Sequence, residues 1–286
     1  MAIVLDNITY TYGMGTPFEK TALRGVSLTI ENGEFLGVIG HTGSGKSTFV
    51  QHLNGLLHPT TGTVTVNGVD ISASTEEAKK MRHKVGMVFQ YPEHQLFEET
   101  IAQDIAFGPK NLGLSVDDVD ERVRDAMKFV GLDYDTYAER SPFHLSGGQM
   151  RRVAIAGVVA MNPDFLVLDE PSAGLDPFGR EEIFEEIIRL HKEKGITVIL
   201  VSHNMEDISR MASRLVVLDK GRVVLDGEPM DIFNNHRDEL QAVGVDVPPV
   251  SVTMEYLREQ GLDVSNRVLS VDDAVQAILE GGSHVK

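Results

Sequence analysis

The sequence contains no cysteine, and basic residues are scarce among its 286 positions. Without cysteine, disulfides, thiol nucleophiles and cysteine-ligated zinc are excluded, which fits a reducing cytosol. The 26 lysine and arginine residues face 43 acidic ones, so the formal net charge is -17. Nucleic-acid binding and attraction to an anionic membrane both depend on positive charge, so this balance argues against both.

Long hydrophobic runs are also missing. The longest uncharged apolar stretch, residues 154–161, is far shorter than the roughly 20 residues that cross a bilayer. Residues 1–6 lack the basic and apolar regions of a signal peptide. With 42% hydrophobic and 24% charged residues, the composition is that of a globular protein. We expect one large domain, or one domain with an appendage, and no transmembrane helix.

Short apolar segments alternate with helical patterns, which favours an α/β fold with a largely parallel sheet. The expected strands lie at residues 35–39, 64–69, 85–89, 165–168 and 197–201, with helices at 46–57 and 178–194 and a closing hairpin at 216–225. Between about residues 92 and 161 the pattern is mainly helical. It predicts a helical subdomain inserted into the α/β core.

From about residue 235 the strand patterns stop, so we expect a main domain over residues 1–235 and a helical extension over 236–286. Helices are expected near 253–260 and 271–279, after a joint at the two prolines 248–249. Ser270 and Asp273 suit the start of the last helix, and Gly281 with Gly282 suits its end. Its apolar stripe consists of Val271, Ala274, Val275, Ile278 and Leu279. We expect this stripe to pack on its own chain, with a partner chain as the alternative.

A phosphate-loop pattern, G-x-x-x-x-G-K-[ST], stands between a strand pattern and a helix pattern. It consists of Gly40, His41, Thr42, Gly43, Ser44, Gly45, Lys46 and Ser47. Glycines let backbone N–H groups turn around a phosphate, and the helix N-terminus adds positive partial charge. Lys46 would reach the β- and γ-phosphates of ATP, Ser47 would bind Mg²⁺, and Thr48 completes the predicted ATP-binding set. The alternative is a glycine-rich turn that binds nothing, and the flanking patterns argue against it.

An apolar strand pattern at residues 165–168 ends in Asp169 and Glu170. Asp169 would hold Mg²⁺ through water, and Glu170 could polarise the water that attacks the γ-phosphate. An apolar run before two acids is common by itself. In one chain with the phosphate loop, it predicts nucleotide hydrolysis.

Residues 145–149 read LSGGQ, 20 positions before the acidic strand begins. This run is the signature of ABC-type ATPases, and the chain resembles that family. The signature would form an anion site, because its serine and glycine amides stand at a helix N-terminus. The resemblance implies that this site meets the γ-phosphate of ATP held by another subunit. Its residues are Leu145, Ser146, Gly147, Gly148 and Gln149.

The other marks of the family follow in order along residues 3–227. By resemblance, Gln90 contacts the metal and the attacking water, His203 lies near the γ-phosphate, and Asp176 belongs to the D-loop at 172–176. Tyr12 resembles the aromatic residue that stacks on adenine, with Tyr10 as a rival. His41 stands where the family often has a small or polar residue, and we expect no loss because backbone amides bind the phosphate there.

The ABC resemblance also has implications for the fold and the ligands. It implies a P-loop NTPase core with an antiparallel β subdomain, the inserted helical subdomain and a C-terminal helical extension. ATP and Mg²⁺ are the ligands it implies. An ABC ATPase that remodels DNA or ribosomes is an alternative from another functional class. We see no coiled coil or zinc module of that class, and the net charge disfavours it.

Further patterns resemble the ATP-binding subunits of energy-coupling factor (ECF) transporters, in particular the second of their two paralogous types. They lie at residues 10–19, 91–97, 100–109 and 149–157. The resemblance implies a motor subunit at the cytoplasmic face of a bacterial cell membrane that drives uptake of vitamins or other micronutrients. Its partners would be a second, paralogous ATPase, a transmembrane energy-coupling subunit and a substrate-binding membrane subunit. An ATPase of an ordinary ABC importer or exporter is the remaining alternative.

The segment from Glu98 to Glu121 contains seven acidic residues and a single basic one. It is either a solvated helical face or, as the resemblance implies, the surface that docks basic helices of the transmembrane subunit. Clustered opposite charge would fix the register of that contact and speed encounter. The predicted docking residues are Phe97, Glu98, Glu99 and Asp104, with Ile101 or Phe107 completing an apolar floor.

Overall fold

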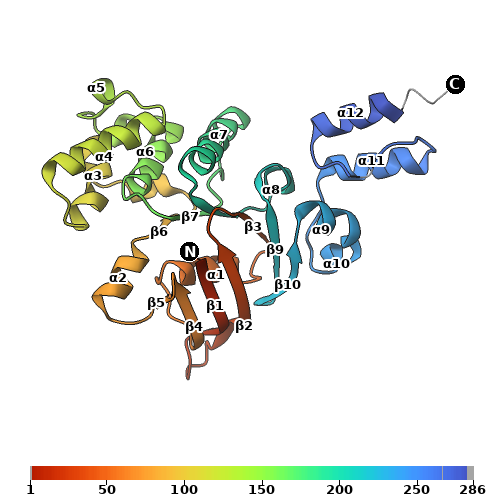
Figure 1. Ribbon diagram of the computed structural model, residues 1–286, viewed down its shortest axis with the longest axis horizontal. Helices are drawn as coiled ribbons and strands as arrows, with labels where there is room; N and C mark the ends of the chain where they lie inside the picture. Colours follow the sequence, from red (N-terminus) through yellow and green to blue (C-terminus); the bar gives the residue numbers. More distant parts are fainter. Residues whose placement is uncertain (1, 266, 282–286) are drawn as a thin grey trace.

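The computed structural model describes residues 2–265 and 267–281, and a six-stranded sheet lies at its centre (Figure 1). Its strand order is β10-β9-β3-β8-β7-β6, and only β10 runs antiparallel to its neighbour. The strands are β3 (Phe35–Ile39), β6 (Val85–Val88), β7 (Phe165–Asp169), β8 (Thr197–Val201), β9 (Arg214–Asp219) and β10 (Arg222–Gly227). The predicted α/β class is confirmed.

Both faces of this sheet are covered, which explains why its central strands are apolar at nearly every position, with Thr197 and Asp169 as polar ends. In β3, Leu36 and Val38 face one hydrophobic cluster, whereas Phe35 and Ile39 face the other. The strands β7 and β8 alternate in the same way. Apolar side chains therefore cover both faces of the sheet, and polar functional groups can lie only beyond the ends of its strands.

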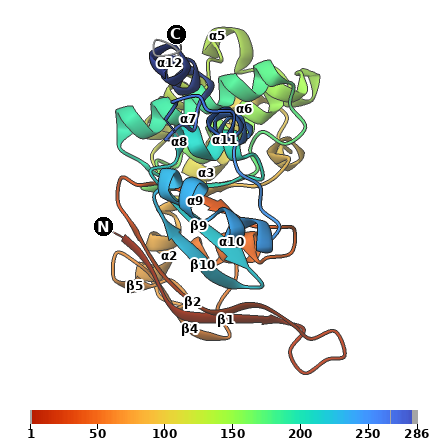
Figure 2. The same ribbon diagram turned by 90° about the vertical axis from the view of Figure 1, so that its right-hand side faces the viewer.

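A second, antiparallel sheet has the order β2-β1-β4-β5 and matches the expected β subdomain (Figure 2). Its strands are β1 (Ala2–Tyr12), β2 (Lys20–Glu31), β4 (Thr61–Val66) and β5 (Val69–Asp70). Helix α1 (Lys46–Leu53) buries Phe49 and Val50 in the cluster that joins the two sheets. It ends earlier than expected because Gly55 adopts a positive φ of 74°.

The segment between β6 and β7 is helical, as predicted, and lies to one side of the sheet (Figure 1). It contains η1 (Pro92–Gln95), α3 (Ile101–Asn111), α4 (Val116–Phe129), α5 (Tyr134–Tyr137), η2 (Pro142–His144) and α6 (Gly147–Val159). Thr100, Ser115 and Ser146 cap three of these helices by accepting backbone N–H groups. Helix α2 (Glu76–Arg82) precedes β6.

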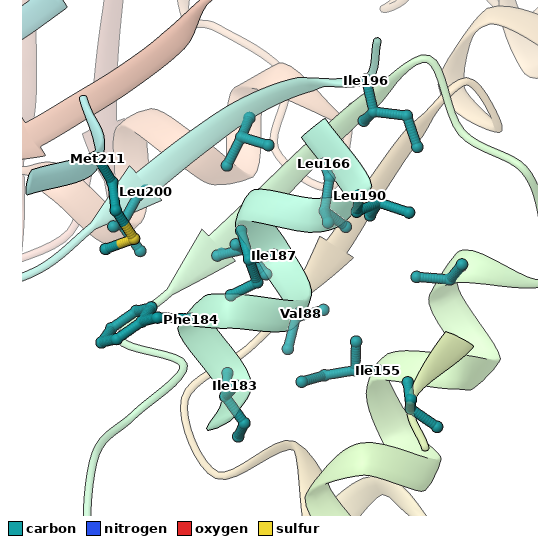
Figure 3. Packing of buried hydrophobic residues seen from close by; sticks show 14 of the residues in the cluster. Val88, Ile155, Leu166, Ile183, Phe184, Ile187, Leu190, Ile196, Leu200 and Met211 are labelled. Carbon is teal, nitrogen blue, oxygen red and sulfur yellow. The ribbon is translucent and has the colours of Figure 1, made fainter. Parts of the chain in front are cut away.

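Helix α7 (Pro177–Lys194) packs on the central sheet and bridges it to the helical segment (Figure 3). Its residues Ile183, Phe184 and Ile187 point into the same cluster as Leu166 of β7 and Ile155 of α6. Gly195 ends the helix with a left-handed φ of 65°. Helix α8 (Met205–Met211) follows β8. The helix after the acidic strand thus links the sheet to the signature helix.

The C-terminal part is helical, and no strand follows β10 in the part of the chain that the structure describes. Its helices are α9 (Pro229–Asn235), α10 (Arg237–Ala242), α11 (Pro249–Glu259) and α12 (Val271–Gly281). Leu240 and Val245 still belong to the large central cluster, whereas Met254 and Ala274 belong to a separate small one. The hydrophobic packing therefore changes later than the boundary expected at residue 235.

Two expectations about this part are refined by the structure. Helix α11 begins at Pro249, earlier than expected, because proline fits the first turn of a helix. The cap of α12 is confirmed, since Ser270 Oγ accepts the N–H of Asp273 at 3.1 Å. Its apolar stripe divides: Ala274 is buried, whereas Val271 is 65% exposed. Gly282, expected beyond the helix end, lies outside the described residues.

None of the helices within the described residues is long and apolar enough to span a bilayer. This finding agrees with the absence of long hydrophobic runs in the sequence.

Candidate active site

Four parallel strands bring the predicted catalytic groups to one edge of the central sheet. The phosphate loop follows β3, Gln90 follows β6, Glu170 follows β7 and His203 follows β8. These strands are neighbours in the order β3-β8-β7-β6. The carboxyl ends of parallel strands are where α/β proteins bind ligands. Strand register therefore places these four sequence segments together.

The phosphate loop owes its shape to two glycines. Gly40 has a φ of 150°, and a Cβ there would lie 2.2 Å from the Leu218 carbonyl oxygen. Gly45 has a φ of 112° and stands at the N-terminus of α1, where a Cβ would lie 2.9 Å from the Ala22 carbonyl oxygen. Beside Gly43, by contrast, no described atom lies within 4 Å of a Cβ position. The loop is packed tightly underneath and open on one side.

The Lys46 ammonium lies across the mouth of this loop. Its Nζ donates to the carbonyl oxygens of Gly40 at 2.7 Å and His41 at 3.1 Å. Burial lowers the pKa of Lys46, and the carboxylates of Glu170 and Asp169 partly oppose that shift. A partly buried cation with an open loop beside it is suited to an anionic ligand.

On the metal side, the Ser47 hydroxyl hydrogen-bonds the carboxylate of Asp169. The pKa of Asp169 is raised above its usual value, mainly because the carboxylate is buried. The hydrogen bond from Ser47 and the charge of Lys46 oppose this shift, and the charge of Glu170 adds to it. A buried carboxylate next to a hydroxyl fits Mg²⁺, which prefers hard oxygen ligands and usually takes the rest from substrate phosphates and water. No cluster of three or more His, Cys, Asp or Glu side chains able to hold a metal occurs among the described residues.

The Glu170 carboxylate is held by the two other predicted catalytic residues. Its Oε2 accepts a hydrogen bond from Gln90 Nε2 at 3.0 Å, and its Oε1 lies 3.3 Å from His203 Nδ1. The Glu170 backbone has a φ of 50°, unusual for a residue with a side chain, and its N–H donates to the Val201 carbonyl at 3.0 Å. Strained backbone at such a place is typical of functional sites.

The structure distinguishes the two tyrosines proposed to stack on adenine. Tyr12 is 41% exposed, and its hydroxyl lies 3.1 Å from that of Thr48, in the helix that follows the phosphate loop. Tyr10 instead packs edge-on against the buried His52, with ring centroids 4.9 Å apart. Tyr12 is therefore the more exposed of the two rings, and its stacking on adenine stays a prediction.

The phosphate loop lines a cavity of about 610 Å³ together with Lys46, Glu170 and His203. Residues 244–246, which follow α10, line the same cavity. His41 bridges the loop to β9, with Nδ1 2.7 Å from the Thr42 carbonyl oxygen and Nε2 2.9 Å from Asp219 Oδ1. Neither residues 244–246 nor Asp219 was predicted, because no sequence pattern marks them.

Four of the five signature residues, Ser146 to Gln149, line a different cavity of about 530 Å³, which the D-loop residue Asp176 also lines, whereas Leu145 packs against the large hydrophobic cluster. Ser146 caps α6 in a capping box with Gln149. Gly147 is exposed and Gly148 half-buried, and no described atom outside the local backbone lies within 4 Å of a Cβ position at either, so this helix N-terminus is open to solvent. Asp176 Oδ1 accepts the N–H of Gly179 at 2.7 Å and caps α7. Within one chain, the signature and the phosphate loop line separate cavities.

Comparison with known proteins agrees with this geometry. The family model described as "ABC transporter" matches residues 23–173. The energy-coupling factor transporter ATP-binding protein EcfA2 of Clostridium tetani is 53% identical, covering 98% of this chain and 97% of its own length. The protein of the same name from Clostridium acetobutylicum is 54% identical, with 98% and 97% covered.

Solved structures give the same result. The cbiO1 protein of Clostridium perfringens, part of the ABC transporter complex cbiONQ, superimposes with a TM-score of 0.73 at 36% identity, covering 84% of this chain and 94% of that one. The ATP-binding cassette MJ0796, solved as a dimer in a post-hydrolysis state bound to ADP and Pi, gives 0.70 at 32% identity, with 79% and 98% covered.

The chain therefore belongs to the ABC transporter family of ATPases. Within it, the chain is a member of the ATP-binding proteins of energy-coupling factor transporters, as its sequence patterns predicted. The predicted fold class, family and ATPase activity are confirmed.

Proposed function

We propose that this energy-coupling factor transporter ATPase hydrolyses Mg-bound ATP with Glu170 as general base, in a site completed by a second, paralogous ATPase subunit. The convergence of Gln90, Glu170 and His203 beside Lys46 carries this proposal. The chain would work at the cytoplasmic face of the membrane. There it would drive uptake of a vitamin or other micronutrient through an energy-coupling subunit and a substrate-binding membrane subunit.

ATP binding would use the groups that the fold already orients. The loop amides and Lys46 would bind the β- and γ-phosphates, and Tyr12 would stack on adenine. The Ser47 hydroxyl, the Gln90 amide oxygen and, through water, Asp169 would hold Mg²⁺. The ion would neutralise charge that develops on the phosphate oxygens. The ammonium of Lys46 would exchange its loop carbonyls for phosphate oxygens, which relieves the cost of its burial.

Hydrolysis would depend on the position of one carboxylate. Glu170 would accept a proton from the attacking water while Gln90 and His203 orient its two oxygens. His203 is 73% exposed on its side chain, so it could turn toward a γ-phosphate in the open cavity. Such catalysis works mainly through positioning and electrostatics, because phosphoryl transfer needs little covalent help from the protein.

The two separate cavities support the proposal of a second ATPase subunit. Lys46 lines one and Ser146 the other, so an ATP molecule contacts both groups only if a neighbouring subunit supplies one of them. The dimeric form of the MJ0796 cassette supports this arrangement. Asp176 lines the same cavity as the signature, which is consistent with a D-loop role at the subunit interface.

The membrane partner would dock on the start of the helical subdomain. Phe97 and Phe107 are 57% and 45% exposed and pack edge to face, with ring centroids 4.9 Å apart. Ile101 is fully buried, so Phe107 completes the apolar floor in its place. Asp104 accepts the N–H groups of Phe97 at 2.9 Å and Glu98 at 3.0 Å, and therefore also shapes the docking segment.

Glu170→Gln tests the assigned base. The amide keeps the shape of the side chain but accepts no proton, so turnover should fall roughly 10²–10⁴-fold while ATP binding persists. Phosphate release and binding of a fluorescent ATP analogue, measured on the assembled transporter, separate the two effects. Glu185→Gln, an exposed acid on α7, is the matched control. Normal ATPase activity in Glu170→Gln would assign the base to another residue.

A further inference from the structure

Arg151 is the most thoroughly buried charged side chain near the site, with 2% of it exposed. It lies in α6, shortly after the signature. Its Nε and Nη2 donate to the two carboxylate oxygens of Glu93 at 3.1 Å and 3.0 Å, and its Nη1 donates to the Pro171 carbonyl at 2.9 Å. One guanidinium thus binds two segments that the sequence keeps far apart.

These contacts complete a closed ring of hydrogen bonds and chain segments that includes the Glu170 carboxylate. Glu93 stands three residues after Gln90, and Gln90 donates to Glu170 Oε2 at 3.0 Å. Pro171 is the residue that follows Glu170. Starting from the carboxylate, the ring runs through Gln90 and Glu93 to Arg151, and returns through Pro171. Gln90 and Glu170, the two residues expected to place the attacking water, both belong to this ring.

The strained backbone of Glu170 explains why such an anchor matters. With its φ of 50°, the residue keeps this conformation only if its neighbours hold it. On one side its N–H donates to the Val201 carbonyl at 3.0 Å. On the other side the Glu170 carbonyl accepts the Ala173 N–H at 3.1 Å, and Pro171 has no N–H, so the Pro171 carbonyl is the next backbone group able to form a hydrogen bond. Arg151 binds that carbonyl.

We propose that Arg151 is a positioning residue for ATP hydrolysis, which fixes the backbone after Glu170 and, through Glu93, the segment after Gln90. The inference rests on the proposed role of Glu170 as the base. Arginine suits the task because its planar fork serves a carboxylate in bidentate fashion and keeps a third donor, which lysine cannot do. Burial opposes ionisation of Glu93, but the bonds from Arg151 hold its pKa below the usual value.

A purely structural role is the competing explanation, since removal of one partner of a buried ion pair destabilises most proteins. The two explanations differ in what they predict about the reaction. A positioning residue affects the chemical step and acts through Glu170. A structural residue affects folding and nucleotide binding to a similar degree, and its effect adds to that of any catalytic change.

The test uses the assembled transporter carrying Arg151→Met, Arg151→Lys or Glu93→Gln. We expect kcat for ATP to fall roughly 10–100-fold in Arg151→Met, the size of a small misplacement at a reacting centre. The lysine and Glu93→Gln variants should lose roughly 3–10-fold, because each keeps part of the hydrogen bonding. The KM for ATP and the binding of a fluorescent ATP analogue should stay within about twofold of wild type in all three, because no nucleotide contact is removed.

The double variant Arg151→Met/Glu170→Gln gives the decisive comparison. If Arg151 acts through Glu170, the double variant should be no slower than Glu170→Gln alone. A further loss in the double variant would overturn the proposal. Wild-type kcat in both Arg151→Lys and Glu93→Gln would also overturn the proposal. These two variants keep the test valid if Arg151→Met fails to fold.

Glu34→Gln is the matched control. Glu34 also pairs with an arginine through both carboxylate oxygens, at 3.3 Å and 3.5 Å from Arg214 Nη1, but it lies at the opposite end of β3 from the phosphate loop. Its kcat should stay at the wild-type value, and a loss equal to that of Glu93→Gln would contradict a local effect. Wild-type activity in Glu170→Gln would overturn the proposed function itself, a result distinct from all of these.

Discussion

The two halves of the nucleotide site are mounted differently in the fold. The phosphate loop and Glu170 follow strands of the central sheet, which apolar side chains cover on both faces. The signature begins α6, which contacts α7 through apolar groups and also through charged ones, including an Arg152–Glu182 ion pair. Nearby, Arg189 of α7 donates to the Phe129 carbonyl. Both halves therefore share the large hydrophobic cluster, but the contact of the signature helix with α7 also contains a polar layer of charged pairs.

The two halves also differ in how far they satisfy their own polar groups. At the phosphate loop, Lys46 donates to carbonyl oxygens of the loop itself, and Glu170 is held by Gln90 and His203. At the signature, Ser146 is occupied by its capping box, but the amides of the following glycines are open. The first half thus pairs its polar groups within the chain, whereas the second half leaves backbone donors open, and we expect these donors to bind an anion.

The largest expected effects come from disabling each half in turn. Ser146→Arg would fill the open helix N-terminus and should reduce ATP turnover of the assembled transporter roughly 10²–10³-fold, the usual loss when donors to a developing charge are removed. Nucleotide binding to the chain's own phosphate loop should persist.

Lys46→Ala should instead weaken that binding roughly 10–100-fold, as expected for lost charge-assisted bonds.

Binding of a fluorescent ATP analogue to this chain and phosphate release by the complex measure the two effects. Ser146→Ala, which removes the hydroxyl without filling the space, is the control for steric blockage. If Ser146→Arg weakened nucleotide binding to this chain as much as Lys46→Ala does, the two halves would belong to one site within the chain.

Sequence patterns predicted the phosphate-loop half almost completely. Its groups follow strands, and a parallel sheet brings strand ends together without further information. Gln90 and His203 were assigned by resemblance to the family, and their convergence on Glu170 follows from the neighbouring strands that precede these residues. The open N-terminus of α6 was predictable for a similar reason, since Ser146 and the glycines after it form a local cap.

Contacts between distant segments were not predictable in this way. Asp219 beside His41 and the ring through Arg151 both join residues far apart in sequence, and no periodicity marks them. Ile101 shows the same limit, because hydrophobicity alone could not distinguish a buried residue from an apolar docking residue. The divided stripe of α12 is a further case, since a stripe predicts a face but not what covers it.

A smaller effect is expected at the start of the helical subdomain, where we propose that the membrane partner docks. Glu98→Lys with Glu99→Lys reverses two charges and should reduce the association rate with the membrane subunits roughly tenfold at low salt, and less at high salt. Asp104 is left unchanged because it accepts backbone N–H groups of this segment. ATP binding by the phosphate-loop half should not change.

Association of the chain with the membrane subunits, followed over time at two salt concentrations, provides the measurement. The matched control reverses Asp125 and Glu139, two exposed acids of the same subdomain that lie outside the segment from Glu98 to Glu121. Equal losses in both double variants would show a general effect of net charge. Unchanged association in Glu98→Lys/Glu99→Lys would place the docking surface elsewhere.

The smallest expected effect concerns the polar layer under the signature helix and depends on pH. Burial raises the pKa of Glu186 on α7 to about 7, Arg152 and Arg189 oppose the shift, and Glu182 adds to it. Between the unfolded pKa of about 4.3 and this value, the folded state binds a proton that the unfolded state lacks. Stability should therefore fall as pH rises through this window and level off above about pH 7.

Glu186→Gln removes the titrating group and should flatten this dependence. At pH 8 the variant should be more stable than wild type by about 1 kcal/mol, a value reduced for the partial exposure of the side chain, and below the unfolded pKa, at about pH 4, the difference should vanish. Urea unfolding midpoints at the two pH values measure it, with exposed Glu185→Gln as the control. Because Glu186 lies beside Arg152 of α6 and away from the phosphate loop, nucleotide affinity of the loop should show no matching change. If nucleotide affinity and the free energy of unfolding changed together, the polar layer between α6 and α7 would be coupled to the phosphate loop. The two halves of the nucleotide site would then not be independent.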